Sequence, residues 1–506
     1  MLFKISSASL LGIEGYPVEV EVDISDGFPT FVTVGLPDPA VRESKERVRS
    51  ALKNCGWDMQ AWKITINLAP ADRKKEGSAF DLPIALGFLA YLEVVPAERL
   101  RDFLFIGELA LDGRLKPARG VLPIALMAKR AGFRGIVVPK ANVREAGLVQ
   151  DLPVYGLENL VQVVRLLAAP GEVAPCRFSL GDLVAPAPDP ADFDEVKGQY
   201  HVKRALEVAA AGAHNVLLIG PPGAGKTMLA RRLPTILPEM TFEEMIEVTQ
   251  VWSAAGLLQE TGAVSRRPFR APHHTITDPA LIGGGLVPRP GEVSLAHRGV
   301  LFLDELPEFR KRVLEDLRQP IEDGRVTVSR SSMSAVFPSA FMLVAAMNPC
   351  EDVFRGLAGA AGGCTESEKA RYYSKISGPL LDRIDIQVEV PEVRFRDMAS
   401  REPAENSAAI RARVTAARER QLRRFTGRKI FANAQMGPRD IKRHCVIPDE
   451  AEKLLETAVT RLGFSARAYD RVLKVARTIA DLEGTDGIGT PHISEAVQYR
   501  MMDKLR

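Results

Sequence analysis

The sequence has no long uncharged apolar stretch, and this absence excludes a membrane-spanning helix. Among the 506 residues there is no run of the roughly twenty apolar positions that a helix needs to cross a bilayer. The N-terminal segment MLFKISSASLLGIEG has neither a long apolar run nor a small-residue cleavage site, so it matches a signal peptide poorly. We therefore expect a cytoplasmic protein without membrane association.

Cysteine is also scarce. The chain has five cysteines, an odd number, and they are scattered along the sequence. A small disulfide-stabilised scaffold shows a denser and even-numbered pattern. We therefore expect reduced thiols at all five positions, which are Cys55, Cys176, Cys350, Cys364 and Cys445.

A strong excess of one charge is missing as well. The net charge is only +3, so the whole chain is not a polycation. The basic residues are uneven, however, because residues 411–429 contain eight Lys or Arg against one acid, Glu419. Such a helix could follow a phosphate backbone. The alternative is a solvated outer face of an ordinary helix.

The length requires more than one hydrophobic core, and composition divides the chain into four segments. Residues 1–168 mix short β-rich runs with helical stretches. Residues 169–191 are rich in Pro, Ala and Gly, which is typical of a linker. Residues 192–400 alternate buried-strand patterns with helices, and residues 401–506 read as helical throughout. The predicted class is α/β.

Residues 215–227 carry the most specific motif. They read NVLLIGPPGAGKT, an apolar strand followed by a glycine-rich turn, and a helix-forming stretch comes next. The glycines let successive backbone N–H groups point at a β-phosphate, and the helix adds its positive N-terminal end. Lys226 is expected to reach the β- and γ-phosphates of ATP and Thr227 to ligate Mg²⁺. The predicted nucleotide-binding residues are Gly220, Pro221, Pro222, Gly223, Ala224, Gly225, Lys226, Thr227 and Met228.

Two later apolar runs also end in polar residues. GVLFLDEL ends its apolar part at Asp304 and Glu305, and FMLVAAMN ends at Asn348. The runs do not alternate, which is typical of strands buried on both faces of a parallel sheet. We expect Asp304 to hold Mg²⁺ through water and Glu305 to polarise the attacking water. If the strand before Asn348 lies between the strands before Gly220 and Asp304, Asn348 would hydrogen-bond the γ-phosphate or that water. The alternative is that Asn348 only begins the turn at Pro349.

These motifs, in this order, resemble the AAA+ ATPases, and most of all the ComM/YifB family in the magnesium-chelatase-related branch. The similarity extends over nearly the whole chain and includes FDEVKGQYHVKRALEVAAAGAHNVLLIGPPGAGKT, FRAPHHTITDPALIGGG (269–285), LRQPIEDG and KISGPLLDRIDI (375–386). The resemblance implies a P-loop α/β/α core followed by a C-terminal helical lid. It also implies that Val196, Gly198 and Gln199 line the adenine pocket.

Two arginines acquire roles from the same resemblance. Arg383, in LDRID, falls where this branch places an arginine finger that reaches into a neighbouring subunit. Arg467 takes the place of the second sensor, a lid arginine that contacts the γ-phosphate. A finger supplied by a neighbour implies a ring, and the family forms homo-hexamers. The alternative for each arginine is a surface ion pair.

Two insertions mark this branch, near residues 269–285 and 323–338. The second one, GRVTVSRSSMSAVFP, alternates like a hairpin. In related ring helicases such hairpins face the central channel, so Arg325 and Arg330 are the expected contacts to DNA phosphates. For the pair His273–His274 we favour loop packing over a metal site, because no third ligand lies at helical spacing.

The chain departs from two family patterns. Family members often carry four cysteines in the region that begins with the NPC motif (residues 348–350 here). This chain has only Cys350 and Cys364 in that region, so a zinc site is not expected. Residues 1–168 resemble a Lon-type protease domain, most clearly at residues 106–142, yet Ala79 and Leu122 occupy the positions of the catalytic Ser and Lys. Peptidase activity is not expected, and this domain would instead serve as an assembly or DNA-guiding collar.

The predicted function is therefore an ATP- and Mg²⁺-dependent motor, a hexameric helicase or branch-migration factor that acts on single-stranded or branched DNA in recombination during natural transformation. One alternative is a magnesium-chelatase-like subunit, although that subunit normally lacks the Lon-like first domain. The other is an ATP-dependent protein remodeller.

Overall fold

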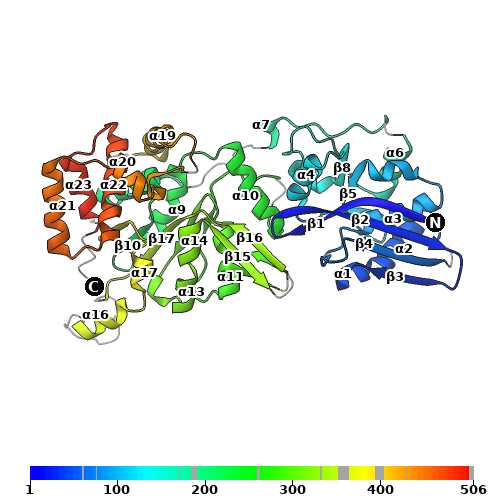
Figure 1. Ribbon diagram of the computed structural model, residues 1–506, viewed down its shortest axis with the longest axis horizontal. Helices are drawn as coiled ribbons and strands as arrows, with labels where there is room; N and C mark the ends of the chain where they lie inside the picture. Colours follow the sequence, from blue (N-terminus) through cyan, green and yellow to red (C-terminus); the bar gives the residue numbers. More distant parts are fainter. Residues whose placement is uncertain are drawn as a thin grey trace.

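The computed structural model describes the whole chain except residues 60–61, 76, 170, 184–190, 259–261, 286, 331–332, 351–363, 394–403, 429 and 501–506. Figure 1 shows an elongated molecule, with the first strands at one end and the last helices at the other. No helix in the described part of the chain is long and apolar enough to cross a membrane.

The N-terminal region contains a four-stranded sheet built on alternating apolar residues. In the second strand Val18, Val20 and Val22 are buried, whereas Glu19 and Glu21 face outward. The order is β1-β2-β4-β3, and only the β3–β4 pair is parallel. Its elements are β1 (Leu2–Leu11), β2 (Glu14–Ser25), β3 (Thr30–Val34), α1 (Pro39–Arg42), α2 (Ser44–Asn54), β4 (Lys63–Ala69) and α3 (Asp81–Tyr91).

A smaller parallel sheet completes this region, in the order β5-β8-β9. Its middle strand is buried along its whole length, as expected for a parallel strand covered on both faces. The elements are β5 (Phe103–Phe105), β6 (Glu108–Leu109), β7 (Leu115–Lys116), α4 (Val121–Arg130), β8 (Gly135–Pro139), α5 (Val143–Ala146), β9 (Val154–Leu157), α6 (Leu160–Ala168) and α7 (Leu180–Leu183).

The central region is a five-stranded parallel sheet in the order β11-β14-β17-β10-β18. The predicted α/β class and the buried parallel strands are therefore confirmed. The strand that ends at Asn348 lies between the strand that precedes the glycine-rich turn and the strand that precedes Asp304, as expected. The strands are β10 (Val216–Ile219), β11 (Phe269–Arg270), β14 (Val300–Leu303), β17 (Met342–Met347) and β18 (Ile386–Glu389).

Helices and two short hairpins surround this sheet. The alternating segment predicted as a hairpin does form one, with Arg325 opposite Pro338 and Arg330 opposite Met333. These elements are α8 (Tyr200–Gly212), α9 (Lys226–Ile236), α10 (Phe242–Ala255), α11 (Asp278–Ile282), β12 (Gly283–Gly284), β13 (Arg289–Pro290), α12 (Glu292–Leu295), α13 (Lys311–Asp316), α14 (Arg318–Asp323), β15 (Arg325–Arg330), β16 (Met333–Pro338), α16 (Glu366–Tyr373) and α17 (Gly378–Leu381).

The C-terminal region is helical, and local sequence sets most of its helix ends. Ser465 caps α22 by accepting a hydrogen bond from Ala468 N–H, a common role for serine just before a helix. The last helix begins at Thr490, and Gly489 is its N-cap. The helices are α19 (Ser407–Arg424), α20 (Pro438–His444), α21 (Asp449–Leu462), α22 (Ala466–Glu483) and α23 (Thr490–Gln498).

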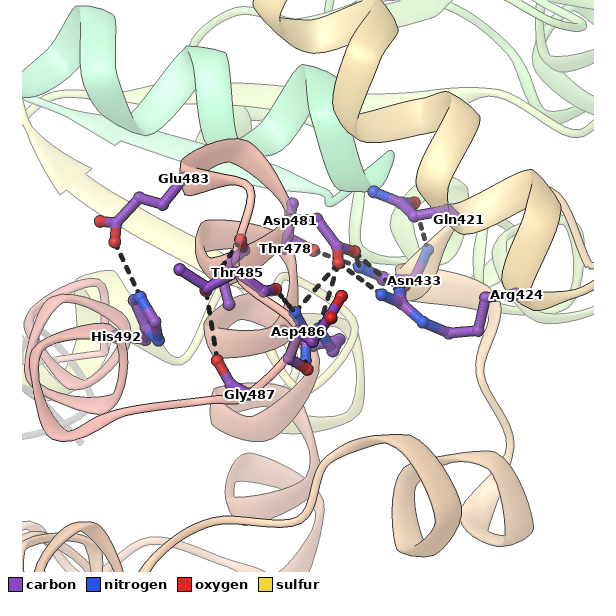
Figure 2. A network of polar contacts seen from close by, with 12 residues as sticks. Gln421, Arg424, Asn433, Thr478, Asp481, Glu483, Thr485, Asp486, Gly487 and His492 are labelled. Carbon is purple, nitrogen blue, oxygen red and sulfur yellow. Dashed lines mark hydrogen bonds and ion pairs between the residues drawn. The ribbon is translucent and has the colours of Figure 1, made fainter.

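A buried polar network holds the C-terminal helices together (Figure 2). Asp481 accepts hydrogen bonds from Arg424 Nη1 and Asn433 Nδ2, both at 2.8 Å, and from Arg477 Nε at 3.2 Å. Gln421 Oε1 accepts from Asn433 N–H at 2.9 Å. Because Asp481 is only 2% exposed, these donors compensate for the cost of burying its charge.

The N-terminal region is docked on helix α10 of the central region, which lies beside α4 in Figure 1. Gln250 Nε2 donates to Ile13 O at 2.8 Å, and Ser253 O accepts from Gly120 N–H at 3.1 Å. The Ser253 hydroxyl also donates to the buried Glu145 carboxyl. Burial raises the pKa of Glu145 above its usual value. These contacts tie the first 168 residues to the helix that precedes the second strand of the central sheet.

Candidate functional site

The glycine-rich turn follows β10 at the carboxyl end of the central sheet, and α9 begins at Lys226. A Cβ added at Gly220 would lie 2.1 Å from Val390 O, so no other residue fits there. Gly223 and Gly225 have φ values of +81° and +87°, which L-residues rarely adopt. Within this turn Pro221 and Met228 are partly buried, Pro222 is exposed and Ala224 is buried.

Lys226 and Thr227 connect this turn to the ends of β17 and β14. Lys226 Nζ donates to Asn348 Oδ1 at 2.9 Å and to the carbonyls of Gly220 and Pro221 at 2.7 and 2.8 Å. The Thr227 hydroxyl donates to Asp304 Oδ2 at 2.6 Å. Strands that adjoin in a parallel sheet end at the same edge, which is why residues far apart in sequence meet here.

The donor set at this edge suits a hard divalent cation held beside phosphates. The Thr227 hydroxyl and the Asp304 carboxylate are oxygen ligands of the kind that Mg²⁺ prefers, and they already adjoin. Among the described residues, no cluster of three or more His, Cys, Asp or Glu is placed to hold a metal by itself. An Mg²⁺ ion here would therefore take its remaining ligands from nucleotide phosphates and water.

Glu305 occupies an unusual backbone position next to Asp304. Its φ is +53°, in the left-handed region that non-glycine residues rarely adopt, and its N–H donates to Asp304 Oδ1 at 3.0 Å. The Glu305 side chain is 56% exposed, and its Oε2 lies 3.5 Å from His274 Nδ1. Sequence reasoning assigned His274 only to loop packing and missed this contact. The signal available was a histidine just after a strand of the same sheet.

The residues expected to line the adenine pocket lie around the start of α8. Gln199 has φ +51°, and its Nε2 donates to Ala224 O at 2.8 Å and to Pro391 O at 3.1 Å. Gly198 has φ +63°, whereas the Val196 side chain is fully buried in the core. Gln199 thus stabilises the glycine-rich turn through its hydrogen bond to Ala224 O.

Arg383 is placed inside its own subunit. It is 8% exposed, and it donates to Pro379 O at 2.5 Å and pairs with Glu322. It lines a polar cleft of about 440 Å³ together with Glu315, Asp316, Arg318, Gln319 and Glu322. The second arginine that the resemblance singled out, Arg467, is 66% exposed and lies 4.0 Å from Asp382.

The segment that carries Arg383 is joined to the C-terminal helices by a buried histidine. His214 Nδ1 lies 3.2 Å from Asp385 Oδ2, and its Nε2 lies 2.8 Å from the Thr478 hydroxyl of α22, which Figure 2 places in the polar network. Burial alone would raise the pKa of Asp385, but the hydrogen bond from His214 and the charge of Arg471 hold it well below its usual range.

The two arginines expected to contact DNA lie on the β15–β16 hairpin, and both are exposed. Arg330 Nε donates to Gly285 O at 3.2 Å, so the two insertions touch each other. The hairpin also meets the N-terminal region, because a Cβ on Gly12 would lie 3.0 Å from Ala335 Cβ.

The basic run at residues 411–429 does not form a free cationic face. Arg413 pairs with Glu207 and Glu405, and Arg424 and Arg428 pair with Asp481 and Asp440. Arg418 donates to the carbonyls of Ala210 and Phe431. Since half of the run is engaged inside the protein, it no longer supports binding to a phosphate backbone. Lys429 lies outside the described residues.

The expectation that all five cysteines stay reduced is wrong for one pair. Cys350 and Cys364 form a disulfide, which brackets the segment after Asn348, whereas Cys55, Cys176 and Cys445 are free. Two cysteines with a sequence separation of 14 gave no sign of pairing, because the pairing depends on how β17 and α16 are placed. The intervening residues 351–363 lie outside the described part of the chain.

A titratable cluster connects α10 with the strand that leads to Asp304. Ala340 N–H donates to His297 Nδ1 at 3.0 Å, so the proton of the neutral ring is on Nε2, which faces Glu247 at 3.2 Å. The hydrogen bond from His297, together with Arg298, lowers the pKa of Glu247 to about 2. Burial lowers the pKa of His297, because its charged form is poorly solvated and would lose the bond from Ala340.

This cluster predicts acid sensitivity. The folded pKa of His297 lies below its usual value of 6.5, so the unfolded chain binds the proton more readily. The contribution of His297 is fully present above pH 6.5 and is lost as the pH falls toward the lowered pKa. We expect the thermal unfolding midpoint to decrease from pH 7.5 to 5.5, and to decrease less in His297→Asn, whose midpoint is already lower at pH 7.5. An equal pH slope in both proteins would contradict this assignment. His201→Asn, at an exposed position, is the control.

Three family models match the chain. The model described as magnesium chelatase, subunit ChlI, matches residues 192–398, and the one described as subunit ChlI of Mg-chelatase matches residues 20–142. The model of the ChlI C-terminal part matches residues 404–500.

Curated relatives extend these matches. The chain is 44% identical to competence protein ComM of Haemophilus influenzae over 502 residues, which cover 99% of this chain and 97% of the relative. It is 44% identical over 504 residues to the uncharacterized protein YifB of Salmonella typhimurium, with the same coverage. It is 24% identical over 339 residues to the magnesium-chelatase 38 kDa subunit of Cereibacter sphaeroides, covering 63% of this chain and 92% of that subunit.

Proposed function

We propose that this chain, which belongs to the ComM/YifB family of magnesium-chelatase-related AAA+ proteins, is an ATP-driven motor that moves along DNA as a homo-hexameric ring. Family membership supports ATP and Mg²⁺ use. One observation carries the ATPase part: Lys226, Thr227, Asp304 and Asn348 meet at one edge of a parallel sheet. This geometry suits phosphate binding by Lys226 and cation binding by Thr227 and Asp304.

The chain's own residues suggest how such a site would work. The N-terminal end of α9 and the N–H groups of the glycine-rich turn would stabilise the phosphate charges. Lys226 would exchange its contacts to Gly220 and Pro221 for phosphate oxygens, while Asn348 would orient the γ-phosphate or the attacking water. Glu305 would accept a proton from, or polarise, that water. A bound Mg²⁺ ion would neutralise part of the charge that develops on the phosphates.

The DNA part of the proposal rests on the β15–β16 hairpin and on the relative named as a competence protein. Arg325 and Arg330 are exposed on the first strand of this hairpin and can contact phosphates without reading sequence. The remaining elements of the proposal are a Lon-like collar at residues 1–168, a lid at residues 401–506, and action on branched DNA during natural transformation in the cytoplasm.

The magnesium-chelatase alternative is weaker. Residues 20–142 match a model described as subunit ChlI of Mg-chelatase, but 92% of the 38 kDa subunit aligns with only 63% of this chain. The chain is also less similar to the chelatase subunit than to ComM. It is 24% identical to that subunit over 63% of its length and 44% identical to ComM over 99% of its length.

The test measures ATP turnover against the concentration of single-stranded, duplex and four-way-junction DNA, alongside separation of a labelled junction. We expect DNA to raise turnover, to bind with little sequence preference, and to lose affinity steeply with salt through counterion release. Flat turnover and no separation, in a preparation shown to form rings and to bind ATP, would contradict the DNA proposal and favour a protein remodeller.

The hairpin arginines give a sharper version of this experiment. Arg325→Ala/Arg330→Ala should lower the slope of log affinity against log salt by about two, because two phosphate contacts are lost. DNA stimulation and strand separation should decrease with it. The matched control is Arg461→Ala, an exposed arginine on α21 at the far end of the molecule in Figure 1. An equal loss in both proteins would point to general charge and not to the hairpin.

A further inference from the structure

Helix α20 carries three positive side chains on its outer side. Lys442 and Arg443 follow Arg439 by three and four residues, so the three share one face of the helix, and all are exposed. Asp440 and Ile441, on the other side, are 4% and 6% exposed. Among the described residues, no ion pair or side-chain hydrogen bond engages any of these three cations. The face that α20 shows to solvent is therefore positive and unbalanced.

Nearby carboxylates do not neutralise this charge. Residues 420–448 contain eight Lys or Arg and one acid, Asp440. That acid is buried and already pairs with Arg428, just after α19. The next residue of α20 after the cations, His444, responds to the positive surroundings. Burial lowers the pKa of His444, and the charges of nearby arginines lower it further.

The stability of the helix does not account for all three cations. Positive side chains in the last turn of a helix interact favourably with its dipole, which would explain Lys442 and Arg443. Arg439, however, lies in the first turn, where a positive charge is unfavourable. It also lies four residues before Arg443, and like charges at this spacing repel each other. An unfavourable and unpaired charge on an exposed face points to an anionic partner.

The composition of this face fits a phosphate backbone better than a protein surface. Apart from the three cations, the only exposed residue of α20 is Pro438. The centres of protein interfaces are depleted of lysine and enriched in aromatic residues, which this face lacks. Arginine and lysine side chains that extend into solvent can instead contact phosphate oxygens without reading sequence.

We propose that Arg439, Lys442 and Arg443 form a second contact for the phosphate backbone of DNA, separate from the β15–β16 hairpin. In Figure 1 helix α20 lies among the C-terminal helices at one end of the molecule, whereas the hairpin lies nearer its middle. The inference rests on the DNA part of the proposed function. It adds that the C-terminal region, and not only the hairpin, binds the strand.

The test compares two double variants of the full-length protein. Lys442→Ala/Arg443→Ala removes two cations of α20, and the matched control Lys453→Ala/Arg461→Ala removes one exposed lysine and one exposed arginine of α21. Binding of fluorescein-labelled single-stranded and duplex DNA is followed by anisotropy over a range of salt concentrations. We expect the α20 variant to lose affinity about tenfold and its slope of log affinity against log salt to fall by about two. The control should bind like the unaltered protein.

Two further variants test the size and independence of the contact. Adding Arg439→Ala should lower the salt slope by about one more. Combining the α20 variant with Arg325→Ala/Arg330→Ala should lower it by about four, because distant sites act additively. ATP turnover without DNA and the thermal unfolding midpoint should stay unchanged in the α20 variants, since no partner in the described part of the chain is lost.

Normal DNA affinity in Lys442→Ala/Arg443→Ala would overturn the proposal, and loss of binding to labelled polyglutamate in that variant would assign α20 to an acidic protein instead. An equal loss in the control would assign the effect to general charge and also overturn it. DNA binding that depends on α20, with flat ATP turnover, would contradict the motor and leave the contact standing. Turnover that DNA stimulates equally in the α20 variant, with unchanged affinity, would do the reverse. Absence of DNA binding at low salt would overturn both.

Discussion

Glu305→Gln is expected to bind ATP as tightly as the unaltered protein and to hydrolyse it about 10²–10⁴ times more slowly. The amide keeps the size of the side chain but cannot take a proton from water. Lys226, Thr227 and Asp304, which we propose bind the phosphates and the cation, have side-chain contacts that do not involve the Glu305 side chain, so binding should survive.

The matched control for this prediction is Glu308→Gln, an exposed carboxylate three residues further along that pairs with Lys375. Turnover is measured at saturating ATP, and affinity with a fluorescent analogue. Normal turnover in Glu305→Gln would mean that another group activates the water. A loss in Glu308→Gln as large as in Glu305→Gln would mean that the whole segment had been disturbed.

Arg383→Ala is expected to leave ATP affinity nearly intact and to lower hydrolysis by about 10³–10⁵, the range for arginine fingers. The structure sharpens this prediction, because in the single subunit Arg383 is buried against Glu322 and Pro379. To act on a neighbour, its guanidinium must leave this cleft. A purely structural role would make Arg383→Ala less stable, which thermal unfolding would detect. Arg318→Ala, which lines the same cleft, is the control.

Mixed rings decide between action on a neighbour and a role within the subunit. Lys226→Ala subunits retain an intact Arg383, and Arg383→Ala subunits retain an intact nucleotide site. If the finger acts on a neighbour, some interfaces of a mixed ring combine the two and recover activity. Absence of recovery in rings verified to contain both kinds of subunit would assign Arg383 a role within its own subunit.

Local motifs account for what could be predicted. The turn at Gly220–Thr227 and the alternating hairpin at residues 323–338 each depend on residues close together in sequence. Short-range backbone conformation and side-chain alternation are properties of the local chain, so the structure agrees with the sequence at these places. The roles proposed for Glu305, Asn348, Arg383 and Arg467 remain predictions until the variants are measured.

Long-range contacts account for what was missed. The sequence left open whether the basic run at residues 411–429 could follow a phosphate backbone. The structure disfavours this, because Arg413, Arg424 and Arg428 pair with carboxylates on other elements. The pairing of Cys350 with Cys364 and the burial of Arg383 are of the same kind, since each depends on where a second element is placed.

The P-loop, the buried parallel strands and the resemblance to the ComM/YifB family all follow from the amino-acid sequence alone, because glycines, apolar runs and capping residues act over a few positions. The position of β11 next to β14, and with it the contact between His274 and Glu305, came only from the folded chain. Strand order in a parallel sheet is set by the packing of the crossover segments, and no local pattern around residues 271–277 or 304–305 encodes which strand end lies beside which.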